Sequence, residues 1–280
     1  MNDYGQIDLA AAATERGCDP ITLEIVRGAL RATQGEMEAL IERTAMSPVI
    51  REKKDFYVAL FDGEGRLIVG SNLPIFGDAI SPILEHYPRA TVRDGDVYWY
   101  NDCYASHGAV SHSPDQVFAC PVSYGDEIVA FAQSWAHFND IGGMRAGSLS
   151  PDCEETFREG IIVPPVLIAR DGRFNDELFR VFVRNSRFPA MVQGDTRASI
   201  AAIRLGERAT SRRVVRALRR CADARRFRSA YGSHQGGGAP SVPGVDPAGR
   251  LSLRRRHRLR RTGAWPGDLA LPPGSRRRPY

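Results

Sequence analysis

The sequence has no run of 18 consecutive apolar residues, which excludes a helix that spans a membrane. Its first 17 residues lack a basic stretch followed by an apolar one, so we expect no secretory signal. The five cysteines are odd in number and far apart, and no two of them form a C-x-x-C pair. This pattern argues against a disulfide framework or a zinc knuckle and favours a reducing cytoplasm.

The glycine-rich loops that bind nucleotide phosphates are also missing. The chain contains no G-x-G-x-x-G and no G-x-x-x-x-G-K pattern, and it lacks the G-x-S-x-G turn of serine hydrolases. We therefore expect no nucleotide-binding loop and no nucleophilic serine elbow in this chain.

Lysine is scarce, and the positive charge is distributed unevenly. The chain has only two lysines, Lys53 and Lys54, against 36 arginines. Residues 1–210 carry 20 basic and 30 acidic side chains, whereas residues 211–280 contain 18 arginines and three acids. The net charge of +5 is thus the sum of an acidic body and a strongly basic tail.

The composition of the tail is unlike that of a folded domain. Residues 231–280 contain only seven Leu, Ile, Val or Phe, too few to bury the apolar area that offsets chain entropy. A nucleic-acid-binding arm, a solvated disordered tail and the translation of a GC-rich gene in a wrong frame are the alternatives. The near absence of lysine and of helical periodicity argues against nucleic acid, and we favour the wrong-frame interpretation. The predicted organisation is a flexible segment 1–18, a domain 19–210 and a basic tail 211–280.

Hydrophobic periodicity in the body predicts helices and antiparallel strands. Apolar residues recur every three to four positions after Asp19-Pro20, a typical helix start. Two hairpins are predicted, with turns at Asp62-Gly63 and at 124–126. We expect an α+β fold or a mixed α/β sheet rather than a doubly wound domain. The predicted elements are helices at 20–46, 153–159, 175–184 and 195–208 and strands at 56–60, 66–69, 97–100, 116–122 and 128–134.

The residues most suited to chemistry lie between positions 101 and 148. His112 and Asp115 flank a Ser-Pro turn just before a predicted strand, and His137 ends the return strand of the same hairpin. Because the start of one hairpin strand lies beside the end of the next, these three side chains can converge. Two imidazoles and a carboxylate with open positions suit a catalytic Mn, Fe or Zn ion. The alternative is that each side chain satisfies backbone groups of its own loop.

Two further aspartates are candidate catalytic residues. Asp140 can orient His137 or bind the metal directly, although a simple turn aspartate is an alternative. Asp102 lies beside Asn101 in the same window. Cys103 and Cys153 lack a neighbouring base or helix start, and we interpret them as structural thiols.

The body resembles the hydantoinase B/oxoprolinase family. The segments that carry this resemblance occur in order over about 19–208 and read DPITLEIVRGAL, MSPVIREKKDFYVALFDGEGRLI, DGDVYWYNDCY, SHSPDQVFACPV, AHFNDIGG, EGIIVPPV and GDTRASIAAIRLGER. The family includes the B-type component of ATP-dependent N-methylhydantoinase, half of 5-oxoprolinase, and subunits of acetone and acetophenone carboxylases. Its members continue well beyond the LGER segment, where this chain has its basic tail, so the resemblance implies a truncated or frameshifted member.

The resemblance implies a division of labour between two subunits. A hydantoinase A-type partner binds ATP and phosphorylates the substrate, and the B-type subunit acts on the activated intermediate. The reaction is hydrolysis of a cyclic amide, or in the ketone enzymes carboxylation. In the acetone carboxylase branch a metal is held at positions that match His112, Asp115 and His137. We therefore expect a cytoplasmic hetero-oligomeric hydrolase with a divalent metal; an inactive fragment is an alternative.

Overall fold

The computed structural model describes the backbone of residues 20–71, 78–125 and 127–231, and side chains within these ranges from 21 to 213. The predicted flexible segment 1–18 and residues 232–280 of the predicted tail lie outside the described residues. All described residues belong to one compact unit. The elements are α2 (Pro20–Thr44), α3 (Pro48–Arg51), β1 (Phe56–Asp62), β2 (Leu67–Gly70), α4 (Ser81–His86), η1 (Arg89–Thr91), β3 (Val97–Tyr100), β4 (Asp115–Tyr124), β5 (Glu127–His137), η2 (Thr156–Arg158), β6 (Val166–Arg170), β7 (Arg173–Phe174), α5 (Asp176–Asn185) and α6 (Pro189–Tyr231).

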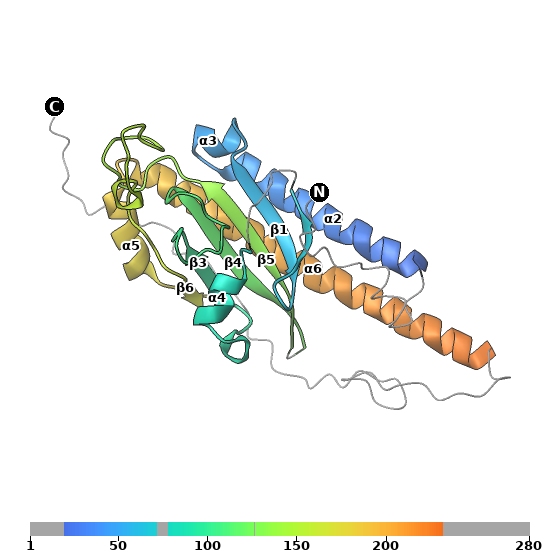
Figure 1. The fold of residues 1–280 in the computed structure, drawn as a ribbon. Coiled ribbons are helices and arrows are strands. Elements are labelled where there is room, and N and C mark those ends of the chain that lie inside the picture. Colours follow the sequence, from blue (N-terminus) through green and yellow to red (C-terminus); the bar gives the residue numbers. More distant parts are fainter. Residues whose placement is uncertain (1–19, 72–77, 126, 232–280) are drawn as a thin grey trace. The chain divides into compact units, whose positions relative to one another are not determined.

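A seven-stranded sheet forms the centre of this unit (Figure 1). The strand order is β2-β1-β5-β4-β3-β6-β7, and every pair of neighbouring strands is antiparallel. The α+β prediction is therefore confirmed. The long β4–β5 hairpin lies at the centre, and its register pairs Asp115 with His137.

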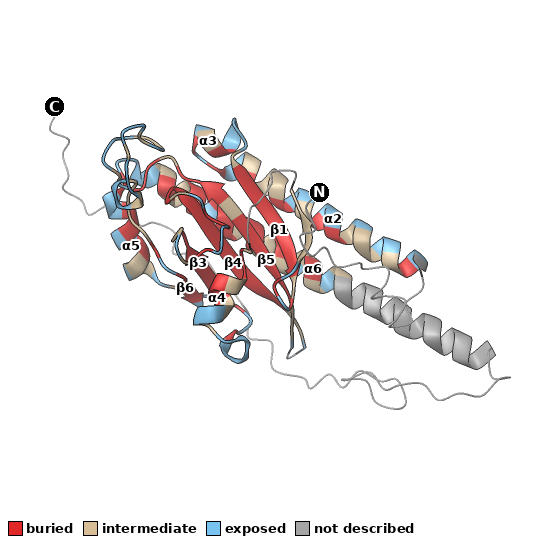
Figure 2. Cartoon of the chain, viewed as in Figure 1, coloured by how far each residue is buried: buried red, intermediate tan, exposed pale blue. Residues whose placement is uncertain are grey.

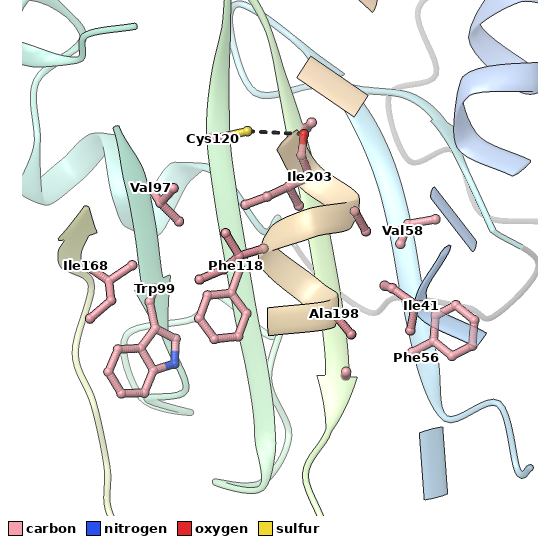
Figure 3. Close-up of a cluster of buried hydrophobic side chains, with 14 of the residues drawn as sticks. Ile41, Phe56, Val58, Val97, Trp99, Phe118, Cys120, Ile168, Ala198 and Ile203 are labelled. Atoms are coloured by element: carbon pink, nitrogen blue, oxygen red, sulfur yellow. Dashed lines mark hydrogen bonds between the residues drawn. The ribbon is translucent and has the colours of Figure 1, made fainter. Parts of the chain in front are cut away.

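Helices α2 and α6 cover one face of the sheet. Met37 and Ile41 of α2 and Ile203 of α6 are fully buried in one apolar cluster with residues of β1, β3 and β4. Figure 3 shows this cluster, including the contact from the Cys120 thiol to the Ile203 carbonyl at 3.4 Å. Trp99 of β3 stacks on Phe118, with ring centres 5.9 Å apart. Burial of these side chains supplies most of the driving force for the fold.

The opposite face carries a second, smaller cluster. Ile80 and Ile83, at the start of and within α4, pack on aromatic residues of the sheet such as Tyr98 and Phe131. The central strands are buried along almost their whole length, as the red ribbons in Figure 2 show. Both faces of the sheet are therefore covered, which is why the strands read as near-continuous apolar runs.

One predicted helix is wrong. The segment 153–159 forms only the 3-10 turn η2 at Thr156–Arg158. Phe157 is 71% exposed, so a longer helix would bury no apolar face here. The backbone instead pairs with another loop, since Met144 N–H donates to the Arg158 carbonyl at 2.8 Å and Gly142 bridges to Gly160.

The last helix is longer than predicted. It begins at Pro189, whose fixed φ suits a first helical position, and it continues to Tyr231. Residues 207–231 contain no glycine or proline, and the first glycine beyond them is Gly232. The helix therefore enters the segment that composition assigns to the tail. None of the helices in the described part of the chain combines the length and apolar character needed to cross a membrane.

Candidate metal centre

Three side chains from the β4–β5 hairpin meet at one point. His112 precedes a turn closed by the bond from Asp115 N–H to the His112 carbonyl at 3.1 Å, and Asp115 is the first residue of β4. His137, the last residue of β5, is the direct cross-strand partner of Asp115. Directly paired residues project from the same face of a sheet. The predicted convergence of these three residues is therefore present in the structure.

The distances between the converging atoms are short. Asp115 Oδ1 lies 2.8 Å from His137 Nδ1 and 3.1 Å from His112 Nε2, and the two nitrogens are 3.0 Å apart. A transition-metal ion with bonds of about 2.1 Å holds its ligand atoms roughly 3.0–3.4 Å apart. The three atoms therefore need only a small expansion to hold such an ion.

Each histidine has a serine hydroxyl at its other ring nitrogen. Ser111 Oγ lies 2.8 Å from His112 Nδ1, and Ser148 Oγ contacts His137 Nε2. In metal sites the second nitrogen of a ligating histidine usually donates to an oxygen in this way. The donor set and its surroundings therefore fit a divalent metal.

The charge balance at the site also fits a cation. Asp115 is 1% exposed, and among the described residues nothing hydrogen-bonds to its Oδ2. Burial would raise the pKa of Asp115, but hydrogen bonds and charge from His112 and His137 outweigh burial and hold that pKa below its usual value. For His112, burial lowers the pKa, and Asp115 together with the charges of Glu159 and Asp55 raises it overall. The site thus contains an ionised carboxylate, one of whose oxygens has no hydrogen-bond partner among the described residues.

Asn101 connects the turn before β4 to the chain that follows η2. Its side-chain NH₂ donates to the carbonyls of Ser113 and Ile161 at 2.6 and 2.8 Å, and its Oδ1 accepts from Val163 N–H at 2.5 Å. Asn101 is fully buried. It therefore fixes the position of the turn that carries His112 relative to the loop that carries Glu159.

Glu159 is an acidic neighbour that sequence reasoning missed. Its Oε2 accepts from the N–H of Ser113 at 2.7 Å, next to His112. Glu159, Asp115 and Asp102 also act on Cys103, where burial first and these charges second raise the thiol pKa to about 11. A thiol with that pKa is protonated near neutral pH, which argues against Cys103 as a nucleophile.

The two predicted catalytic aspartates occupy different positions. Asp102 Oδ1 accepts from Tyr104 N–H at 2.9 Å and so closes a local turn near the site. Asp140 is buried and forms an ion pair with Arg187, at 2.9 Å from Oδ2 to Nη1. No hydrogen bond joins Asp140 to His137 among the described side chains. The geometry favours an indirect role for Asp140, and the catalytic role of both residues stays a prediction.

The remaining histidines of the body lie away from the centre. His107 is exposed and its Nε2 lies 3.0 Å from Glu85 Oε2, and that hydrogen bond is the main reason its pKa is raised. His86 is the exposed last residue of α4. Ser148, Arg187, Asn101 and Glu159 carried no recognisable spacing, although Asn101 and Glu159 stand inside the quoted segments DGDVYWYNDCY and EGIIVPPV.

The chain belongs to the hydantoinase B/oxoprolinase family, which it matches over residues 19–218. A relative from Pseudomonas sp. (strain NS671), named as the B component of a D-/L-hydantoinase, is 35% identical over 198 residues, covering 67% of this chain and 33% of the relative. The beta component of the caprolactamase of Pseudomonas jessenii is 34% identical over 194 residues, covering 68% and 33%. The chain thus spans about a third of the length of these relatives.

The fold is shared with a solved relative. The crystal structure of the ATP-dependent caprolactamase from Pseudomonas jessenii superimposes with a TM-score of 0.62 at 29% identity, covering 78% of this chain and 40% of that one. The delta component of the acetophenone carboxylase of Aromatoleum aromaticum is 30% identical over 149 residues, covering 51% of this chain and 21% of the relative. Several relatives are therefore named as single subunits of larger enzymes.

Proposed function

We propose that this chain is the metal-bearing part of a B-type subunit in an ATP-dependent hydrolase of cyclic amides. The convergence of His112, Asp115 and His137 within 3.1 Å, in a chain of this family, carries the proposal. Its relatives include one component of a hydantoinase and one of a caprolactamase, and both names denote action on a ring amide.

The three residues would hold a divalent Mn, Zn or Fe ion between two imidazoles and a carboxylate. Such an ion polarises a carbonyl or lowers the pKa of bound water. Asp115 would contribute one negative charge, and its buried Oδ2 has no hydrogen-bond partner among the described residues. Asn101 and the Ser113 N–H fix Glu159 beside this point, where its carboxylate can accept a hydrogen bond from a substrate N–H.

A partner would supply the activation step. The chain has no nucleotide-binding loop, and a solved relative is an ATP-dependent caprolactamase. We therefore assign ATP binding and phosphorylation of the substrate to a hydantoinase A-type subunit, and action on the activated intermediate to the B-type subunit. Assignment to the cytoplasm is part of the same proposal, supported by the free thiols of Cys103, Cys120 and Cys153.

Metal binding is the first test of this proposal. We expect the full chain to bind Mn²⁺ or Zn²⁺ at one site, and His112→Ala to weaken the affinity at least about 100-fold because one of three ligands is lost. His86→Ala, an exposed histidine of α4, is the control and should bind like the parent. Titration calorimetry and metal analysis after dialysis give the affinity and the stoichiometry. Equal binding by parent and His112→Ala would refute the site.

The reaction is tested separately, with the A-type subunit and ATP present. Hydantoin or 5-oxoproline should be hydrolysed together with ATP, and His112→Ala should abolish hydrolysis. Metal binding without hydrolysis would identify the chain as an inactive fragment that retains its site.

A carboxylase is the second candidate, because a relative is the delta component of acetophenone carboxylase. Bicarbonate discriminates between the two reactions. A carboxylase consumes bicarbonate and ATP with a ketone, whereas a hydrolase of cyclic amides turns over without bicarbonate.

A further inference from the structure

The loop after β5 folds back onto the metal centre through Ser148. Its hydroxyl contacts Nε2 of His137, while Nδ1 of the same ring points to Asp115 and His112. His137 is only 4% exposed, so its ring has no room to turn freely. The side of the ring that faces away from the metal centre is therefore occupied by one residue of this loop.

We propose that Ser148 is a positioning residue that makes His137 a metal ligand through Nδ1, and that the Asp140–Arg187 ion pair holds Ser148 in place. The inference rests on the proposed metal site. It concerns which ring nitrogen binds the ion and what fixes that choice.

The ion pair closes the 142–148 loop on itself. Asp140 Oδ1 accepts from Gly142 N–H at 3.1 Å, and Asp140 Oδ2 accepts from Gly147 N–H at 3.3 Å. Arg187 donates to the carbonyls of Gly143 at 2.5 Å and Arg145 at 3.1 Å. Asp140 thus hydrogen-bonds to both ends of the loop, and Arg187 hydrogen-bonds to its middle. Ser148 directly follows Gly147, the last residue of the loop that Asp140 holds.

The charge state of Asp140 favours a stable ion pair with Arg187. Burial would raise its pKa, but hydrogen bonds from Arg187 and from the backbone of Gly142 and Gly147 outweigh burial and lower the pKa. The carboxylate is therefore ionised at neutral pH. Gly142 is also held at φ +91°, and a Cβ there would lie 2.6 Å from the Asn185 carbonyl, so the loop is pressed against the end of α5.

The consequence is an asymmetric pair of ligands. A neutral imidazole carries one N–H, and the nitrogen that binds a metal must be the other one. His137 would donate from Nε2 to Ser148 and bind through Nδ1. His112 would have the opposite arrangement, since Ser111 stands at Nδ1 and Nε2 faces Asp115 and His137.

The test uses the full chain, Zn²⁺ alone and histidine labelled with ¹⁵N. In the zinc-loaded parent, His137 should show a metal-bound Nδ1 and a protonated Nε2 whose proton exchanges slowly with water. Ser148→Ala should speed that exchange and weaken zinc affinity about 10–100-fold, measured by competition with a chromogenic chelator. Ser148→Thr keeps a hydroxyl and should restore most of the affinity.

Two further variants complete the test: the first is a matched control, and the second changes Arg187. Ser150→Ala changes a hydroxyl in the same region whose bond is to Asp152 N–H, and it should bind zinc like the parent. Arg187→Lys keeps the positive charge but loses the paired bonds to the Gly143 and Arg145 carbonyls. Its zinc affinity should lie between that of Ser148→Ala and that of the parent. Far-ultraviolet circular dichroism confirms that each variant is folded.

The outcomes separate this inference from the proposed function. A parent that does not bind zinc refutes the metal site itself. A parent that binds zinc through Nε2 of His137, or a Ser148→Ala variant with unchanged affinity and exchange, refutes the role of Ser148 while the metal site stands.

Discussion

At the scale of single residues, the side-chain amide of Asn101 joins two segments beside the candidate metal centre. Asn101 satisfies three backbone groups from two segments that are remote from each other in sequence. A side chain with both donors and an acceptor is needed, because two of these groups are carbonyls and the third is an N–H. Aspartate cannot donate to either carbonyl, and alanine leaves all three groups without their partner.

We predict that Asn101→Ala lowers the free energy of unfolding by about 2–4 kcal/mol, because the Ser113 and Ile161 carbonyls and the Val163 N–H lose a buried partner. Urea unfolding followed by circular dichroism measures the change. Asp102→Asn is the control, since the amide oxygen can still accept from Tyr104 N–H, and it should stay within about 0.5 kcal/mol of the parent. A small effect of Asn101→Ala would mean that water replaces the amide.

At the scale of elements, the packing of α2 and α6 on the sheet decides which residues the helices tolerate. Gly35 of α2 is exposed, and a Cβ there would meet nothing within 4 Å. Gly206 of α6 is buried, and a Cβ there would lie 2.5 Å from Met37 Sδ and 3.1 Å from Ala132 Cβ. The packing therefore leaves room for a side chain at Gly35 but not at Gly206.

We predict opposite effects for the same substitution at these two glycines. Gly35→Ala should stabilise the fold by about 1 kcal/mol, because alanine is the better helix former and no contact opposes it. Gly206→Ala should destabilise it by about 1–3 kcal/mol, because Met37 and Ala132 of β5 must both move away from α6. The urea concentrations at the midpoint of unfolding, with the same denaturant slope for all variants, give both changes in the free energy of unfolding. A stabilising Gly206→Ala would show that Met37 repacks without loss.

At the scale of the whole molecule, the acidic body and the basic tail meet within one helix. Helix α6 passes position 210 without a break, and Arg213 donates to the Ala29 carbonyl at 3.2 Å and to Glu36 at 2.6 Å, both in α2. The first part of the basic segment therefore contributes to helix packing. The predicted boundary at residue 210 stays a prediction for the rest of the segment.

We predict that a chain ending after Tyr231 melts like the full chain, whereas one ending after Thr210 melts about 2–8 °C lower. The shorter chain loses the end of α6 and the charge-assisted bonds of Arg213, worth about 1–2 kcal/mol in this half-exposed position. Differential scanning calorimetry of the three chains measures the shift. A lower melting temperature for the chain ending at Tyr231 would show that residues 232–280 stabilise the fold.

Local pattern in the sequence was enough for the fold class, the two hairpins, the long first helix and the convergence of His112, Asp115 and His137. Period-2 alternation and turn residues define the hairpins, and the ends of hairpin strands are adjacent, so residues 25 positions apart could be placed together. The same local reasoning failed at 153–159, where a bridge between two loops replaced a helix with no apolar face to bury.

Tertiary structure decided the surroundings of the triad. Asn101, Glu159, Ser148 and Arg187 act through hydrogen bonds to residues in other segments of the chain, and such bonds leave no periodic signal. Asp140 shows the difference most clearly. The sequence placed it near His137, but only the folded chain pairs it with Arg187, a residue 47 positions away, and so makes it the anchor of a loop. Local pattern thus determined which elements form, whereas long-range packing decided which polar groups meet.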